Sequence, residues 1–299
     1  MDKFTKSIII IGSEGFIGRN LVNQALDDGY HVVGIDIVQR FKGILKNYTF
    51  IKSCINEFDF NSLMNLNVDA IYHLAARTDL NGSNIGDYMI NFTFSESLEK
   101  FSNKSKAKFI YFSSQLVNKY GVEDCKFYNS DNFYGASKAL GESEVKNKFK
   151  NYRIVRPSSV WGPHMKKPYA EFFNLAYRLG FVINSNLFDI PKSFYYVGNC
   201  LKDTIDNKHK LMYLTNQPVL LSSWMSYVAT QGEYKEIKIN RSLMVLLFRL
   251  GRLLRVTALN KRRFINMTTS TNIKECIILS PDELNNGMNE TWLNFKTNR

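Results

Sequence analysis

The sequence predicts an α/β fold in which helices cover both faces of a doubly wound parallel sheet, because short apolar runs alternate with helical stretches over its first half. Four of these runs are long enough for a buried strand and too short for a buried helix: residues 7–11, 31–35, 68–76 and 108–112. The chain has 299 residues, 44% of them hydrophobic, which suffices for a large domain and a smaller one.

The strand–helix alternation also divides the chain. It is lost after Gly162-Pro163, where the sequence becomes mainly helical in character. We expect one domain at residues 1–160 together with about 190–215, and a smaller, mainly helical domain at 161–189 and 216–299.

A glycine-rich turn follows the first strand and opens a helix that runs from Arg19 to Asp28. Its glycines permit a tight turn and close backbone approach to a pyrophosphate, while the helix N-terminus offers N–H donors to phosphates. Strand, turn and helix in this order predict a Rossmann-type domain that binds a dinucleotide. The predicted cofactor contacts of the turn are Gly12, Gly15, Phe16, Ile17 and Gly18.

An acidic residue, Asp36, ends the second strand, 18 residues after Gly18. At this place a carboxylate accepts a hydrogen bond from the adenosine ribose and repels a 2′-phosphate. The sequence therefore favours NAD over NADP, although the nearby Arg40 leaves NADP open.

Small and polar residues end the next two strands. Leu74, Ala75 and Ala76 follow one strand, and the Ser113-Ser114 pair follows the other. Because ligands bind at the carboxyl ends of strands in such sheets, we expect these residues beside the cofactor and the substrate.

Tyr134 and Lys138 are four residues apart, so on a helix they share one face. A lysine cation beside a phenol favours the phenolate and would bring the tyrosine pKa toward neutrality, as a general acid/base requires. With Ser114 to hold the substrate oxygen, these groups predict hydride-transfer chemistry. The alternative is an ordinary exposed helix face.

Together these motifs resemble those of the extended short-chain dehydrogenase/reductases, specifically the nucleotide-sugar epimerases, dehydratases and reductases. The resemblance covers residues 7–200 and includes the glycine turn, the Ser113-Ser114 pair and the Tyr134/Lys138 spacing. Three further segments carry it: His73–Ala76, Arg156-Pro157 and Trp161–Pro163.

The resemblance implies a catalytic triad of Ser114, Tyr134 and Lys138, and a homodimer built on the helix after Asp87 and the helix that carries Lys138. It implies further cofactor contacts from Tyr134, Lys138, Asn91, Pro157 and Ser159. It implies substrate contacts, with a nucleoside-diphosphate sugar as partner, from Arg77, Ser114, Gln115 and Arg178.

Two positions depart from the family pattern. Cys54 stands where many relatives carry an aspartate for the adenine, and Gln115-Leu116 stand where 4,6-dehydratases carry an Asp-Glu pair. Neither Gln115 nor Leu116 can act as the acid or base that dehydration needs, so the sequence disfavours a dehydratase.

Composition narrows the remaining classes. The net charge is +12, but nucleic-acid motifs are lacking, and we attribute most of the excess to single solvated lysines. Cysteines and histidines lack metal-ligand spacing, so we expect no metal. The N-terminus resembles no signal peptide, and apolar runs fall short of a membrane span, which suggests a cytoplasmic protein.

Residues 242–256 predict an amphipathic helix with leucines on one side and arginines opposite. We favour leucines buried against neighbouring elements, and association with a membrane surface stays open.

The leading hypothesis is an NAD-dependent C4 epimerase or 4-keto-sugar reductase acting on a nucleotide-activated sugar. The alternatives are a non-catalytic NAD-binding module at a membrane and a dehydrogenase of a non-sugar alcohol.

Overall fold

A computed structural model describes residues 6–40, 45–118, 130–166, 169–253, 261–271, 273 and 275–297. These residues form two compact units. The first contains residues up to 118, 130–158 and 197–214, and the second contains 159–196 and the residues from 215 onward.

In its described part, the first unit contains a seven-stranded parallel sheet. Its strands are β1 Ser7–Ile11, β2 His31–Asp36, β3 Tyr48–Lys52, β4 Val68–His73, β5 Lys108–Phe112, β6 Tyr152–Pro157 and β11 Leu211–Leu214. In space they are ordered β11-β6-β5-β4-β1-β2-β3, so the chain order reverses between β1 and β4. Ligands bind beyond the carboxyl ends of strands at such a switch point.

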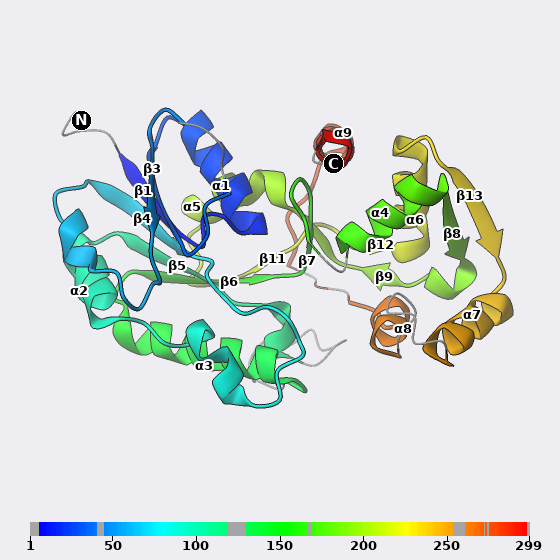
Figure 1. Cartoon of the computed structure of the whole chain (residues 1–299), viewed down its shortest axis with the longest axis horizontal. Coiled ribbons are helices and arrows are strands. Elements are labelled where there is room, and N and C mark those ends of the chain that lie inside the picture. Colours follow the sequence, from blue (N-terminus) through cyan, green and yellow to red (C-terminus); the bar gives the residue numbers. More distant parts are fainter. Residues whose placement is uncertain are drawn as a thin grey trace. The chain divides into compact units, whose positions relative to one another are not determined.

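Helices cover both faces of this sheet, α2 and α3 on one face and α1 and α5 on the other (Figure 1). The α-helices of this unit are α1 Phe16–Asp27, α2 Glu96–Ser105, α3 Phe133–Lys148 and α5 Cys200–Ile205. Short 3₁₀ helices are η1 Phe60–Leu63, η2 Ile85–Asn91, η3 Gln115–Val117 and η5 Val197–Asn199. The expected fold class, a Rossmann-type doubly wound sheet, is confirmed.

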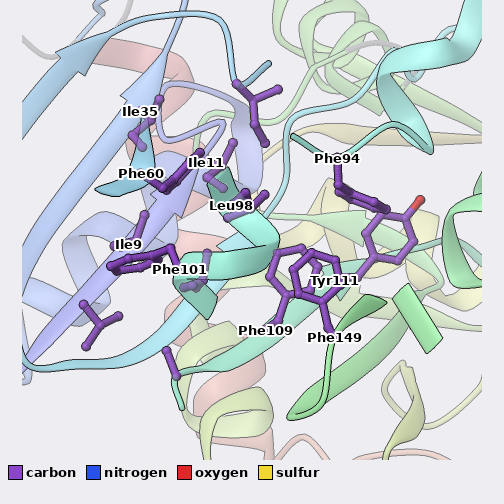
Figure 2. Close-up of a cluster of buried hydrophobic side chains, with 14 of the residues drawn as sticks. Ile9, Ile11, Ile35, Phe60, Phe94, Leu98, Phe101, Phe109, Tyr111 and Phe149 are labelled. Carbon is purple, nitrogen blue, oxygen red and sulfur yellow. The ribbon is translucent and has the colours of Figure 1, made fainter. Parts of the chain in front are cut away.

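The main core lies between the sheet and helices α2 and α3. Figure 2 shows side chains of β1 and β5 meeting residues of those helices. Phe109 of β5 stacks on Phe149, which ends α3, with ring centres 3.8 Å apart and planes 6° from parallel. Because β1 is buried along its whole length, its sequence reads as a continuous apolar run.

The second unit is built from five α-helices and short strand pairs in its described part. Its helices are α4 Tyr169–Leu179, α6 Leu221–Gln231, α7 Arg241–Leu253, α8 Lys261–Thr268 and α9 Pro281–Thr297, with the 3₁₀ helix η4 Asn186–Phe188. Its strands are β7 Ser159–Trp161, β8 Phe181–Ser185, β9 Pro191–Lys192, β10 Phe194–Tyr196, β12 Val219–Leu220 and β13 Lys235–Ile239. An aromatic cluster that includes Phe173, Trp224 and Trp292 fills its interior.

Two expected helices can be compared with the structure. The helix expected after Asp87 is the 3₁₀ segment η2, kinked at Tyr88, and α2 begins only at Glu96. The basic helix is α7, and residues 254–256 of its expected span lie outside the described residues. No helix in the described part of the chain is long and apolar enough to cross a membrane.

Candidate active site

The glycine turn after β1 is packed too tightly for side chains. Gly12 has a φ of +86°, and a Cβ on it would lie 2.7 Å from the backbone nitrogen of Ala75. A Cβ on Gly18 would lie 2.1 Å from the carbonyl oxygen of Gly12. Glycine is therefore required at both positions, for the left-handed φ at the first and for helix–turn packing at both.

The N-terminus of α1 follows directly. Gly15 is its N-cap, Phe16 and Ile17 form its first turn, and among the described residues neither a side-chain cap nor an acidic first-turn residue occupies this end. The first backbone N–H groups of a helix lack partners within the helix and carry partial positive charge. This end of α1 thus fits the pyrophosphate of a dinucleotide.

Asp36 lies against the same turn. Its Oδ2 accepts a hydrogen bond from the backbone N–H of Glu14 at 3.0 Å, and its Oδ1 accepts one from Val38 at 3.2 Å. These bonds hold the carboxylate at the carboxyl end of β2, where the sequence predicted a ribose contact.

Glu14, a residue that the sequence did not single out, brings a second carboxylate to this place. It is buried, and it accepts hydrogen bonds from the backbone N–H of Arg40 at 2.5 Å and from the hydroxyl of Tyr48 at 3.1 Å. The guanidinium of Arg40 donates to the carbonyl oxygen of Glu14 at 2.9 Å. Burial raises the pKa of Tyr48 well above its usual value, so this phenol remains a donor to Glu14.

The segment after β4 returns to the glycine turn. The backbone N–H groups of Leu74 and Ala75 both donate to the carbonyl oxygen of Ile11, at 2.8 and 3.0 Å. Ala76 follows them in the same irregular segment. Leu74 and Ala75 therefore lie beside the glycine turn, and their contact with a dinucleotide stays a prediction.

Asn91 is fully buried and joins two elements. Its Oδ1 accepts from the backbone N–H of Arg77 at 2.8 Å, and its Nδ2 donates to the carbonyl oxygen of Arg77 and to Ser137 Oγ of α3, at 3.0 and 2.9 Å. Ser137 in turn donates to the carbonyl oxygen of Tyr134 at 2.7 Å. In this structure Asn91 positions α3 against the loop that begins at Arg77.

Tyr134 begins the catalytic face expected on α3, which Asn132 caps by accepting from the N–H of Gly135 at 2.8 Å. Burial raises the pKa of the Tyr134 phenol to about 12, although a hydrogen bond with Ser114 lowers it. This direction is opposite to the predicted one, because burial has the largest effect on the Tyr134 pKa. Among the described residues, Lys138 is not one of the groups that lower this pKa.

Lys138 lies one turn further along α3 and is buried. Its Nζ donates to the carbonyl oxygen of Phe112 at 2.8 Å and lies 4.9 Å from the centre of the Tyr111 ring. Burial lowers the pKa of Lys138 to about 7, against the charge of Glu142, which raises it. The ammonium is thus held at the carboxyl end of β5, next to Ser113 and Ser114.

Glu142, one turn beyond Lys138, forms a buried network that the sequence did not predict. Its carboxylate accepts two hydrogen bonds from the guanidinium of Arg156, both at 2.8 Å, and one from Ser113 Oγ at 2.6 Å. Burial alone would lower the pKa of Arg156, but Glu142 and Tyr213 raise it above its usual value. The network ties α3 to β5 and β6.

Two glycines allow α3 to lie close to its neighbours. A Cβ on Gly135 would lie 1.9 Å from the carbonyl oxygen of Leu116, and one on Gly141 would lie 2.1 Å from the hydroxyl of Tyr111. Both contacts are shorter than van der Waals separation, so side chains at these positions would push α3 away.

The remaining predicted residues are more dispersed. Arg77 is partly exposed and bonded to Asp79 and to the carbonyl oxygen of Asp87. Gln115, half-buried, begins η3 directly after Ser114. Arg178 is exposed near the end of α4, and Ser159 begins β7, both in the second unit.

Pro157 ends β6 and is buried, and Ser158 follows it. The hydroxyl of Ser158 is buried and has no hydrogen-bond partner among the described residues. A buried hydroxyl normally has a partner. An orphaned one at the predicted nicotinamide side fits a bound dinucleotide.

A polar cavity of about 470 Å³ lies in the second unit, and the predicted site residues are not among those that line it. The cavity is lined mainly by serine and asparagine side chains, with one aspartate and one lysine. These residues come from β8, η4, the start of α6 and the end of β13. Its residues are far apart in the sequence, so no local signal could have indicated it.

Comparison with known proteins agrees with this geometry. The sequence pattern of the NAD dependent epimerase/dehydratase family matches residues 8–178. The dTDP-D-glucose 4,6-dehydratase of Bos taurus is 27% identical over 189 residues, which cover 54% of this chain and 53% of that protein. The UDP-glucose 4-epimerase of Vibrio cholerae is 29% identical over 192 residues, which cover 58% of this chain and 57% of that protein. The chain spans about half the length of the curated relatives it matches.

Among solved structures, a UDP-N-acetylglucosamine 4-epimerase from Methanobrevibacter ruminantium, in complex with UDP-N-acetylmuramic acid, has the same fold. The TM-score is 0.70, the identity is 17%, and the match covers 99% of each chain.

Proposed function

Since the chain belongs to the NAD dependent epimerase/dehydratase family, we propose that it is an NAD-dependent enzyme acting on a sugar carried by a nucleoside diphosphate. The proposed reaction is either epimerisation at C4 or reduction of a 4-keto sugar. The observation that carries the proposal is the grouping of Ser114, Tyr134 and Lys138 at the carboxyl end of β5 and on one face of α3.

The proposed cofactor residues fit a dinucleotide. The glycine turn lets a pyrophosphate approach the backbone closely, and the N-terminus of α1 offers N–H donors. Asp36, at the end of β2, is proposed to accept a hydrogen bond from a ribose hydroxyl. When bound, the nicotinamide supplies or receives the hydride. NAD rather than NADP is supported by two carboxylates, Asp36 and Glu14, at the ribose end.

The proton step is assigned to Tyr134. With a pKa of about 12 the phenol is protonated at neutral pH, so it can donate a proton to a sugar ketone oxygen that Ser114 also contacts. Removing a proton from a sugar hydroxyl requires the phenolate, which the hydrogen bond with Ser114 favours and burial opposes. Reduction of a 4-keto sugar uses the first step alone, whereas epimerisation uses both.

Dehydration is disfavoured, although one relative is a dehydratase. Ser114 Oγ accepts from the N–H of Leu116 at 3.1 Å, and Gln115 and Leu116 follow it where an acid and a base would have to lie. Neither side chain transfers protons.

The proposal is tested by incubating the purified protein with a panel of nucleoside-diphosphate sugars and their 4-keto derivatives, with NAD, NADH or NADPH. Products are identified by NMR and mass spectrometry. An epimerase gives an isomer of unchanged mass without net cofactor consumption, and a reductase gives a product two mass units heavier with consumption of NADH.

Two results would count against the proposal. Turnover of a sterol or another non-sugar alcohol, with the sugar panel unchanged, would favour the alternative dehydrogenase. Tight cofactor binding without turnover of any substrate class would favour the non-catalytic module.

A further inference from the structure

Helix α7 presents a row of leucines to solvent. Leu243, Leu246, Leu250 and Leu253 have exposed fractions of 43, 49, 45 and 78%. Their spacing of three, four and three residues places them on one stripe of the helix. The sequence favoured leucines buried against neighbours, and for these four that expectation is wrong.

The opposite side of α7 holds the helix in place. Met244, Phe248 and Gly251 are buried, and the ring of Phe248 lies 5.1 Å from that of Phe264 in α8, in an edge-to-face arrangement. Asn240 caps the helix by accepting from the N–H of Leu243 at 2.8 Å. The leucine row is therefore not a frayed end but the outer face of a packed helix.

Positive charge is concentrated in the stretch of sequence that contains α7. From residue 237 to residue 274 the sequence contains nine lysines and arginines and no aspartate or glutamate. Since the whole chain has a net charge of +12, this stretch supplies most of the excess, contrary to the view that scattered lysines explain it. Arg241 and Arg249 of α7 are exposed, and Arg249 lies next to the row, three residues after Leu246 and four before Leu253.

We propose that α7 docks on the surface of an anionic lipid bilayer, with the leucine row in the acyl boundary and Arg249, at the edge of the row, at the phosphate groups. A helix of this kind lies in the plane of the interface. With 13 residues, α7 is about 20 Å long, which is shorter than the roughly 30 Å hydrocarbon core. Association in the plane uses its full length.

Two other partners fit the same face less well. A second copy of the chain would bring two acid-free basic stretches together, which like-charge repulsion opposes. A nucleic acid would satisfy the arginines through its phosphates but offers the leucine row no apolar partner. A bilayer surface satisfies both parts of the face.

The test is co-sedimentation of the full chain with vesicles of phosphatidylcholine alone and of phosphatidylcholine mixed with phosphatidylglycerol. At low salt the wild-type protein should bind the anionic vesicles at least about tenfold more tightly than the neutral ones. The double variant Leu246→Glu/Leu250→Glu should lose about tenfold or more in binding, because it removes the buried apolar area. Arg249→Gln should lose roughly fivefold in binding to the anionic vesicles.

The matched control is Leu293→Glu, which changes an exposed leucine of α9. It should bind vesicles within about twofold of wild type. Thermal unfolding and sedimentation velocity check that every variant keeps its fold and oligomeric state.

The proposal would be overturned if the wild-type protein did not bind anionic vesicles, or if the control and the α7 leucine variant lost equal amounts of vesicle binding. A change of oligomeric state caused by the α7 leucine variant alone would also overturn it. That result would assign the face to a second copy. Binding that depends on Arg249 but not on the leucines, or that RNA supports and vesicles do not, would also exclude bilayer docking.

Discussion

Arg156 and Glu142 form a two-pronged ion pair in which Nε and Nη2 of the guanidinium lie 2.8 Å from the two carboxylate oxygens, and both side chains are buried. Removing one partner of such a pair leaves an uncompensated buried charge. Ser113 also donates to Glu142, and Lys138 lies one helical turn before it. The ion pair therefore fixes α3, which carries Tyr134 and Lys138, against the end of β5, which precedes Ser114.

We predict that Glu142→Ala lowers the free energy of unfolding by about 3–5 kcal/mol, since Arg156 would keep its charge without a partner. Urea unfolding measures the change. Glu96→Ala, which breaks an exposed i,i+4 pair with Lys100, is the control and should cost less than about 1 kcal/mol. Similar losses in the two variants would show that the buried pair has no special role.

Tyr134→Phe should preserve the fold but reduce turnover by about a hundred- to ten-thousand-fold, because it removes the hydroxyl that moves the substrate proton. Cofactor affinity should stay near the wild-type value, since the ring remains. Steady-state kinetics on the identified substrate and calorimetric titration with NAD measure both quantities. More than a tenth of wild-type turnover in this variant would refute the assignment of Tyr134.

Lys138 should make stability depend on pH. Its pKa is lowered from 10.5 to about 7 on folding, so between these values the unfolded chain binds a proton that the folded chain does not, and stability rises with pH. Lys138→Met removes this dependence. Its melting temperature relative to wild type should therefore fall as the pH is raised from about 6.5 to 10.

A pH-independent difference in melting temperature would show that the lysine titrates normally in the folded chain. The same variant should also weaken both turnover and NAD affinity, in contrast to Tyr134→Phe, because Lys138 is proposed to contact the nicotinamide ribose as well as the phenol.

NAD should bind more tightly than NADP, because Asp36 and Glu14 place two carboxylates where a 2′-phosphate would lie. Asp36→Asn should narrow the preference, and calorimetric titration with both cofactors measures it. Since Arg40 bonds to the carbonyl oxygen of Glu14, Arg40→Gln is an informative partner variant. A tenfold preference of the wild type for NADP would contradict the role of Asp36.

A homodimer through η2 and α3 remains a prediction. Met89 and Leu140, on these two elements, have exposed fractions of 56 and 45%, and a dimer of this kind would cover them. Sedimentation velocity at micromolar concentration should show a dimer for wild type and a monomer for Leu140→Glu, with Leu293→Glu as control. A monomeric wild type would reject the prediction.

The sequence predicted the first strand, the glycine turn and the helix after it because their determinants are local. The glycine turn, the strand before it and Asp36 lie within 30 residues, and steric limits on the turn leave few alternatives. The cap at Asn132 is local in the same sense.

Contacts between distant residues could not be predicted in this way. Glu14 meets Tyr48 and Glu142 meets Arg156 only because helices and strands bring them together, and neither pair has a spacing that signals contact. The pKa of Tyr134 had the wrong predicted direction because burial depends on the whole packing around the ring. Periodicity predicted the leucine row of α7 but could not tell which stripe of the helix neighbours would cover.

Gly135 follows Tyr134 directly and Gly141 lies three residues after Lys138, and each lets α3 touch a different neighbour, the Leu116 carbonyl and the Tyr111 hydroxyl. Helix α3 therefore packs closely against its neighbours at two points, so a shift along its axis or a rotation would bring atoms into collision. Substitutions will be tolerated elsewhere in this unit sooner than at these two glycines. Among relatives with different substrates, the sequence of α3 around these glycines should vary least. Changes of substrate preference should arise in segments that do not pack against α3.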